Sequence, residues 1–192
     1  MSPALVVALR TASLLAFAAP LLLTVGGRRR FLGTHPGQGR GDRVALFANL
    51  TAFGLFLPSL LAFRGTLTGY TALVLALAGC LLAVAGATLV LRSRMELGPA
   101  WSFVPMANEA TGLVMTGPYR LVRHPIYLGF SMLAMGEALA FASWPALVVV
   151  FAGIVPTFLW RASAEETLLT ATFGDRYARY RRQAKMIIPR LL

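Results

Sequence analysis

Two short polar clusters interrupt the strongly apolar C-terminal half of this chain. The first covers residues 117–129 and has the sequence GPYRLVRHPIYLG, and the second covers residues 161–166 and has the sequence RASAEE. Arginine, histidine and glutamate side chains can form ion pairs, hold protons and bind charged groups of a small molecule. We expect the two clusters to form one site, because the apolar segment between them would return the chain to the same side of a membrane.

The first cluster contains residues that set the backbone. Gly117 and Pro118 suit a turn, and Pro125 suits the first turn of a helix because its missing N–H would be unpaired there anyway. His124 is then placed at the start of a helix, followed by Tyr127. The free N–H groups at such a helix start favour an anionic group of a ligand.

The composition describes an integral membrane protein. Hydrophobic residues make up 57% of the 192 residues and charged residues only 13%, and the mean hydropathy is +0.70. A chain of this length and composition has room for one helical bundle and no separate soluble domain. We treat residues 1–192 as a single domain, with N-terminal spans in residues 1–96 and the candidate site in residues 97–192.

The apolar stretches predict an all-α bundle of about five transmembrane helices. A crossing needs about 20 apolar residues, and one overlong stretch is divided by a turn signal at residues 143–145. We interpret the last two spans as a short helical hairpin, followed by a cytoplasmic C-terminal helix that includes residues 173–180. The expected spans are Leu5–Val25, Val44–Phe63, Tyr70–Leu91, Tyr127–Ala142 and Pro145–Trp160. A secretory signal is the alternative for the first stretch, because residues 16–19 resemble a cleavage region.

Basic residues are concentrated in alternate connections between the spans. They gather in the first loop, the third loop and the C-terminal tail, whereas only Arg10 and Arg64 lie elsewhere. Since short cytoplasmic loops hold the positive excess, we predict an N-terminus outside and both polar clusters on the cytoplasmic face. Orientation explains most of the net charge of +11. We therefore expect no nucleic-acid partner, and we expect the tail to contact membrane lipids.

Each candidate residue also has a purely structural explanation. The arginines can be interfacial anchors, the tyrosines can belong to an aromatic belt, and His124 can be a helix cap. Glu165 and Glu166 can form a solvated helix end beside Arg161. However, an arginine four positions before a glutamate is the less favourable order for a helical ion pair.

Other features of the membrane segments are open to two interpretations. Glu137 lies within an expected span, where an ionisable group is costly without a partner or a wet cavity; we favour a solvated position at the outer interface over a functional one. Gly79 and Gly86 can pack against a helix of the same chain or of another chain, so the oligomeric state is open. The segment from Glu96 to Glu109 is too broken for a helix, and we expect it to lie along the membrane surface, where it could cover or admit a substrate.

The motifs resemble the isoprenylcysteine carboxyl methyltransferase family and its relatives among the membrane phospholipid methyltransferases. The resemblance rests on GPYR at 117–120, RHPIYLG at 123–129, EETLL at 165–169 and FGDRYARY at 173–180. The order and spacing of these motifs agree with the family. They cover about residues 97–189, so the N-terminal half is supported only by the number of spans.

The resemblance implies methyl transfer from S-adenosyl-L-methionine to a lipophilic acceptor at the cytoplasmic membrane face. It implies that the C-terminal half encloses the cofactor, and it assigns no metal-binding residues. The implied cofactor-binding residues are Gly117, Pro118, Tyr119, Arg123, His124, Pro125, Tyr127, Glu165 and Glu166.

Arg161 and Glu166 are the expected catalytic residues. A guanidinium stays charged and can bind a carboxylate through two hydrogen bonds, so Arg161 could orient an anionic acceptor while Glu166 holds Arg161 in place. The acceptor group itself, a carboxylate, amine or thiol, is not identified by the sequence. Two other functions are open: an NADPH-dependent membrane reductase of the sterol type, and a non-catalytic lipid-binding membrane protein.

Overall fold

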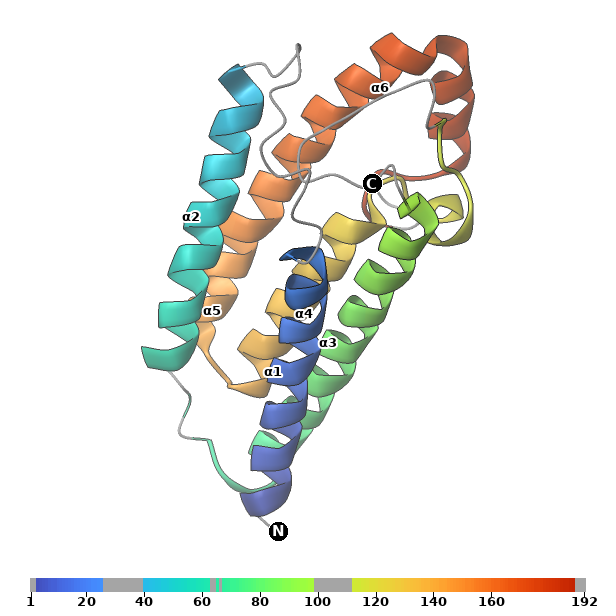
Figure 1. Cartoon of the computed structure of the whole chain (residues 1–192). Helices are drawn as coiled ribbons and strands as arrows, with labels where there is room; N and C mark the ends of the chain where they lie inside the picture. Colours follow the sequence, from blue (N-terminus) through green and yellow to red (C-terminus); the bar gives the residue numbers. More distant parts are fainter. Residues whose placement is uncertain (1–2, 26–39, 63–64, 66, 99–111, 189–192) are drawn as a thin grey trace.

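The chain folds as a bundle of long helices (Figure 1). The computed structural model describes residues 3–25, 40–62, 65, 67–98 and 112–188. Its helices are α1 (Pro3–Val25), α2 (Arg40–Ala62), α3 (Gly69–Leu97), α4 (Pro125–Ala140), α5 (Trp144–Val149) and α6 (Val155–Gln183), with a 3-10 helix η3 (Gly117–Arg120) and a π-helical turn η4 (Val150–Ile154). Within these residues the only β-pairing is an isolated bridge between Val122 and Lys185. The predicted all-α class is confirmed.

Each of the five predicted spans lies largely on a helix. Three helical segments are long and apolar enough to cross a membrane, namely Pro3–Pro20, Gly69–Leu97 and the continuous helix Trp144–Gln183. The apolar part of α2, Phe47–Ala62, and the whole of α4 are shorter apolar helices. A chain with three such helices is a membrane protein, because long apolar helices are the means by which a chain satisfies its backbone in lipid.

The helix that carries the fifth span extends well beyond the predicted boundary at Trp160. α5, η4 and α6 follow one another without a break, so the second polar cluster lies on a helix and not after one. Loss of hydrophobicity at Arg161 marks the end of the membrane-spanning part, and the helix continues past it. The direction changes at Gly174, whose φ of 49° is left-handed, and the chain then turns back (Figure 1).

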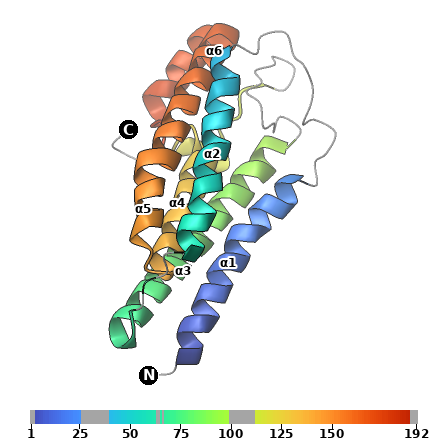
Figure 2. The same ribbon diagram turned by 90° about the vertical axis from the view of Figure 1, so that its left-hand side faces the viewer.

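The predicted hairpin between α4 and α5 is present. Ser143 caps α5, because its hydroxyl oxygen accepts a hydrogen bond from the backbone N–H of Ala146. The same hydroxyl donates to the carbonyl of Ser59, and the N–H of Gly65 donates to the carbonyl of Phe141. The hairpin turn therefore lies beside the α2–α3 connection, at the end of the bundle where the N-terminus lies (Figures 1 and 2).

Small residues allow α3 and α4 to pack at very short range. A Cβ atom added to Gly86 would lie 2.6 Å from the carbonyl oxygen of Gly129, and one added to Gly136 would lie 2.7 Å from the carbonyl oxygen of Gly79. These contacts involve backbone atoms, which cannot rotate away. Gly79 and Gly86 thus pack within the same chain, against α4, in the manner of small-residue interfaces between membrane helices.

Glu137 is buried inside the bundle, so the expected solvated position is wrong. Its exposed fraction is 0%, and the hydroxyl of Ser13 on α1 donates to its Oε2 at 3.1 Å. Arg10 on the same helix donates from Nε to the carbonyl of Ala140. α1 covers this part of α4, which hydropathy alone does not reveal.

The segment expected to lie along the membrane surface falls mostly outside the described residues, which resume at Gly112. Its first residue, Glu96, is at the end of α3. The Oε2 atom of Glu96 accepts a hydrogen bond from the hydroxyl of Thr116 at 2.8 Å. This contact joins the end of α3 to the start of η3.

Candidate functional site

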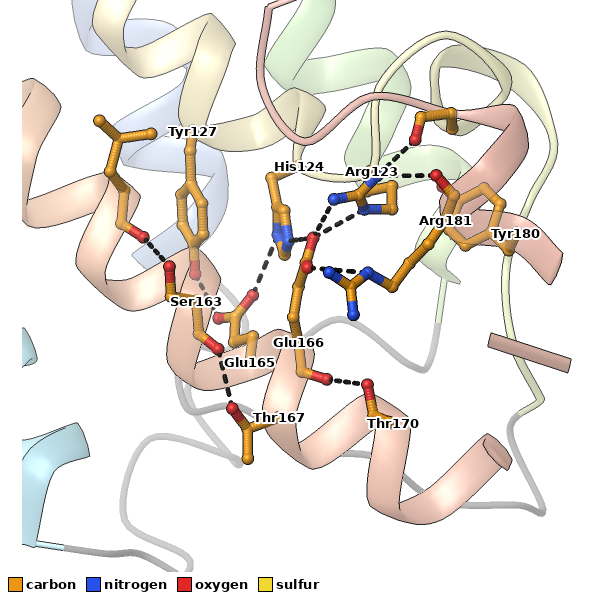
Figure 3. A network of polar contacts seen from close by, with 12 residues as sticks. Arg123, His124, Tyr127, Ser163, Glu165, Glu166, Thr167, Thr170, Tyr180 and Arg181 are labelled. Carbon is orange, nitrogen blue, oxygen red and sulfur yellow. Dashed lines mark hydrogen bonds and ion pairs between the residues drawn. The ribbon is translucent and has the colours of Figure 1, made fainter. Parts of the chain in front are cut away.

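The two polar clusters meet at one end of the bundle, as predicted (Figure 3). α4 begins at this end and α6 passes beside it, because the α4–α5 hairpin returns the chain from the opposite end. Pro125 occupies the first turn of α4 and His124 precedes it. His124 makes no side-chain capping hydrogen bond, so its imidazole is turned toward the glutamates of α6 instead of its own helix.

Arg123 and Glu166 form the tightest ion pair of the site. Nε and Nη2 of Arg123 both lie 2.6 Å from Oε1 of Glu166, and the two side chains are 9% and 8% exposed. Oε2 of Glu166 has a longer contact, 3.4 Å from Nε of Arg181. Oε1 of Glu166 is therefore tightly bound by Arg123, whereas Oε2 has the longer contact with Arg181.

Tyr127 connects Arg161 to Glu165. Its hydroxyl donates to Oε1 of Glu165 and accepts from Nε of Arg161 at 2.9 Å. The ring is stacked between His124 and Phe158, with centroid distances of 5.6 and 4.9 Å. Stacking on both faces fixes the direction of the hydroxyl.

The expectation that Glu166 holds Arg161 is wrong, because Glu165 does so. Nε of Arg161 lies 3.5 Å from Oε1 of Glu165. Residues four apart on a helix share a face, whereas a residue five positions on points about 100° further round. Because α6 continues past Arg161, the two neighbouring glutamates point in different directions. Glu165 faces Arg161, and Glu166 faces Arg123.

His124 lies between the two carboxylates. Its Nδ1 is 3.4 Å from Oε2 of Glu165, its Nε2 is 3.5 Å from Oε1 of Glu166, and its side chain is 5% exposed. Burial alone would lower the pKa of His124, but the two glutamates outweigh burial and raise the pKa above its ordinary value of 6.5. Nε2 lacks a partner with hydrogen-bond geometry among the described residues. A buried donor of this kind can serve a ligand.

The electrostatic balance keeps Glu166 ionised. Burial raises the pKa of its carboxyl, but the contacts with His124 and Arg123 lower the pKa by more than burial raises it, to about 2. The site therefore holds a negative charge at neutral pH, next to the Arg123 guanidinium. Such an arrangement suits a ligand that carries charges of both signs.

The segment after Gly174, residues 175–188, is called the C-terminal arm here, and it is fastened to the first cluster. The N–H groups of Arg123 and His124 donate to the carbonyls of Lys185 and Met186, at 2.7 and 3.0 Å. Nη1 of Arg123 donates to the carbonyls of Arg181, at 3.3 Å, and of Ala184. Arg123 therefore holds both Glu166 and the arm.

Gly117, Pro118 and Tyr119 form η3, next to the network and not within it. Gly117 has a φ of 56°, and a Cβ there would lie 2.6 Å from Oε1 of Glu96, so only glycine fits. Tyr119 is buried, and its carbonyl accepts a hydrogen bond from the hydroxyl of Tyr180 at 2.7 Å. Tyr119 therefore contacts the C-terminal arm, whereas Gly117 lies against the end of α3.

An open pocket of about 510 Å³ lies between the part of α6 before Gly174 and the C-terminal arm. Small-molecule sites typically have volumes of roughly 300–1,000 Å³. The lining includes Ser163, Glu166, Thr167, Thr170, Arg181 and Met186. The part of the chain that the structure describes contains no group of three histidine, cysteine, aspartate or glutamate residues suited to a metal ion.

Most of this lining is not predicted by the sequence motifs. Ser163, Thr167 and Thr170 are spaced three and four apart with Glu166 between them, which is the signature of one helix face. Arg181 was counted only as part of the basic tail. The glycine at 174 was the signal that the helix turns back and brings Arg181 to Glu166.

The fold and the site together define an all-α membrane protein with a buried network of arginine, histidine and glutamate at one end of its bundle. The chain belongs to the phospholipid methyltransferase family, whose sequence profile matches residues 74–176, slightly more than half of the chain. The match covers α3 from residue 74 onward, η3, α4, α5, η4 and α6 as far as residue 176. Every residue of the predicted site falls within it.

Named relatives agree with this membership. A protein-S-isoprenylcysteine O-methyltransferase of Schizosaccharomyces pombe is 34% identical over 97 residues, 50% of this chain and 41% of that protein. Protein-S-isoprenylcysteine O-methyltransferase A of Arabidopsis thaliana is 36% identical over 83 residues, 43% and 42% of the two chains. Methanethiol S-methyltransferase 1 of Bradyrhizobium diazoefficiens is 33% identical over 97 residues, 44% and 31%. The chain thus spans less than half the length of each of these relatives.

Proposed function

We propose that this chain is a membrane methyltransferase that transfers a methyl group from S-adenosyl-L-methionine to a lipophilic acceptor. The observation that carries the proposal is the buried Arg123–His124–Glu165–Glu166 network beside an open pocket. The network lies within the segment matched by the family profile. The names of the relatives above support methyl transfer to a carboxyl group or a thiol.

The residues of the pocket fit this methyl donor. S-adenosyl-L-methionine would supply a methyl group bonded to a positively charged sulfur. Its ribose hydroxyls and charged groups need hydroxyl, cationic and anionic partners. The pocket offers the hydroxyls of Ser163, Thr167 and Thr170, the guanidinium of Arg181 and the carboxylate of Glu166. Nε2 of His124, which makes no hydrogen bond to any residue that the structure describes, is a further buried polar atom at this site.

The predicted cofactor-binding residues divide into two roles in this proposal. His124 and Glu166 contact the ligand, whereas Arg123, Tyr127 and Glu165 hold these two side chains in place through the contacts described above. Gly117, Pro118, Tyr119 and Pro125 shape the backbone around them. Removing a positioning residue then weakens ligand binding through displacement of its neighbours.

Arg161 is the residue we propose to orient the acceptor. It directly follows Trp160, where the apolar part of the helix ends, and its side chain is 11% exposed. Tyr127 and Glu165 fix its guanidinium. A lipid-anchored acceptor with an anionic head group would meet this cation at the membrane surface, and correct alignment of two reactants lowers the barrier to their reaction.

The orientation is part of the proposal. The N-terminus would lie outside and the site would face the cytoplasm, because the basic residues of the sequence gather in the first loop, the third loop and the C-terminal tail, and short cytoplasmic loops hold the positive excess. The α2–α3 connection and the α4–α5 turn lie at the other end (Figure 2).

A direct assay tests the proposed reaction. Membranes that contain the protein are incubated with methyl-labelled S-adenosyl-L-methionine and extracted with organic solvent. We expect label in lipophilic material, reduced about 10- to 100-fold in an Arg161→Gln variant because the acceptor loses its orienting charge. Arg120→Gln, an exposed arginine of η3, is the matched control and should retain activity. Equal activity of the wild type and the Arg161→Gln variant would contradict the role of Arg161.

A further inference from the structure

Arg181 and Glu166 face each other across the pocket through a loose contact. Nε of Arg181 lies 3.4 Å from Oε2 of Glu166, and the Arg181 side chain is 50% exposed. The Arg123–Glu166 contact, by comparison, is 2.6 Å long and nearly buried. A long, half-exposed ion pair contributes little to stability, so a ligand can separate these two groups at low cost.

Both groups of this pair have unused hydrogen-bonding capacity. Arg123 takes up Oε1 of Glu166 with two nitrogens, whereas the contact at Oε2 is long. Each carboxylate oxygen can accept about two hydrogen bonds, and a guanidinium carries five N–H donors. Oε2 can therefore accept from a cationic donor, while the exposed part of Arg181 can donate to an anion.

We infer that Arg181 and Glu166 bind the α-amino-carboxylate end of the methyl donor, an assignment that rests on the function proposed above. The ammonium group of the ligand donates to Oε2 of Glu166, and its carboxylate accepts from the guanidinium of Arg181. A ligand end that carries an ammonium and a carboxylate therefore gives both Glu166 and Arg181 a new partner when their mutual contact is broken. A ligand with only one of the charges leaves the other side of the pocket uncompensated.

The side chain of Arg181 is separable from the structural role of its backbone. Backbone carbonyls hold the C-terminal arm at this point. The carbonyl of Arg181 accepts from Nη1 of Arg123, and the carbonyls of Lys185 and Met186 accept from the N–H groups of Arg123 and His124. A substitution of the side chain leaves these backbone contacts in place. Arg182 is the next residue, is exposed and is not part of the pocket lining, so it provides a control with the same change of charge.

Two ligands that differ at the amino-acid end test the inference. S-adenosylhomocysteine carries the α-amino and carboxylate groups, and 5′-deoxy-5′-methylthioadenosine lacks both. Calorimetric titrations of the purified full chain are compared for the wild type, Arg181→Gln and Arg182→Gln. We expect Arg181→Gln to weaken S-adenosylhomocysteine binding about 10-fold or more, as loss of a charge-assisted hydrogen bond does, and to leave the affinity for methylthioadenosine unchanged. Arg182→Gln should change neither affinity.

The other outcomes separate this inference from the proposed function. Unchanged S-adenosylhomocysteine affinity in Arg181→Gln overturns the inference, and so does an equal loss for both ligands, which would indicate distortion of the arm. In both cases the wild type still binds the methyl-donor product, and the proposed function stands. A folded wild type that binds neither ligand overturns the proposed function and the inference with it.

Discussion

At the scale of single residues, Tyr127 contacts four other side chains, those of His124, Phe158, Arg161 and Glu165. Replacing it with phenylalanine keeps the stacked ring but removes the hydroxyl that joins Arg161 to Glu165. Removing one partner from a buried polar group costs about 1–3 kcal/mol. We expect the Tyr127→Phe variant to unfold at a lower temperature in detergent. Tyr70→Phe is the control, because Tyr70 is 73% exposed, and an equal shift in both variants would contradict the role of the hydroxyl.

His124 predicts a pH dependence of stability. Its pKa is raised in the folded protein, so its interaction with Glu165 and Glu166 is fully present below about pH 6.5, the value in an unfolded chain. The contribution is lost as the pH rises through the folded pKa. The difference in thermal stability between the wild type and a His124→Asn variant should therefore shrink as the pH increases above 6.5. A constant difference up to pH about 9 would show that the imidazole is not charged in the folded state.

At the scale of elements, the close approach of α3 and α4 holds the first polar cluster in place. A Cβ at Gly136 would lie 2.7 Å from the backbone of α3, so the helices must separate to admit it. Overpacking of this kind costs about 1–3 kcal/mol. We expect Gly136→Ala to lower the unfolding temperature. Gly54→Ala on α2, where no atom lies within 4 Å of the added Cβ, should be neutral or slightly stabilising.

The kink at Gly174 positions the C-terminal arm, and its effect is conformational. The space around a Cβ at this position is open, but the backbone conformation, with φ of 49° and ψ of −126°, costs an L-residue roughly 1–3 kcal/mol. In a Gly174→Ala variant, we expect trypsin to cut at Arg176 and Arg179 faster than in the wild type, because the arm detaches more often. Unchanged cleavage rates would show that the arm tolerates an ordinary helical backbone at this point.

At the scale of the whole molecule, the orientation can be measured directly. Cys80 is the single cysteine, so a Cys80→Ser background allows one reporter at a time. We expect a membrane-impermeant maleimide to label a Leu67→Cys variant in intact cells, because the α2–α3 connection would be outside. An Asp175→Cys variant should react only after lysis. The reverse pattern would invert the proposed topology.

The sequence predicts much of this fold because hydropathy and turn residues act locally. The five apolar stretches, the turn at residues 143–145 and the helix start at Pro125 all follow from neighbouring residues. The meeting of the two polar clusters also follows, since a hairpin must return the chain to the same end. The number of spans between His124 and the two glutamates therefore predicts that these side chains lie at the same end of the bundle.

Other features depend on contacts between distant segments, which local patterns do not show. Glu137 is buried because α1 covers it. The pairing of Arg161 with Glu165 depends on the helix continuing past the last apolar residue. Arg181 joins the pocket because the chain reverses at Gly174 and the arm is fastened by Arg123. The position of each of these residues is set by tertiary packing.

The most direct test of the account is calorimetric titration of the detergent-purified protein with S-adenosylhomocysteine, with NADPH as the control ligand. The account predicts saturable binding of S-adenosylhomocysteine that both His124→Ala and Glu166→Ala weaken, and no binding of NADPH. Binding of NADPH alone, or no binding of either ligand to folded protein, would contradict the methyltransferase site.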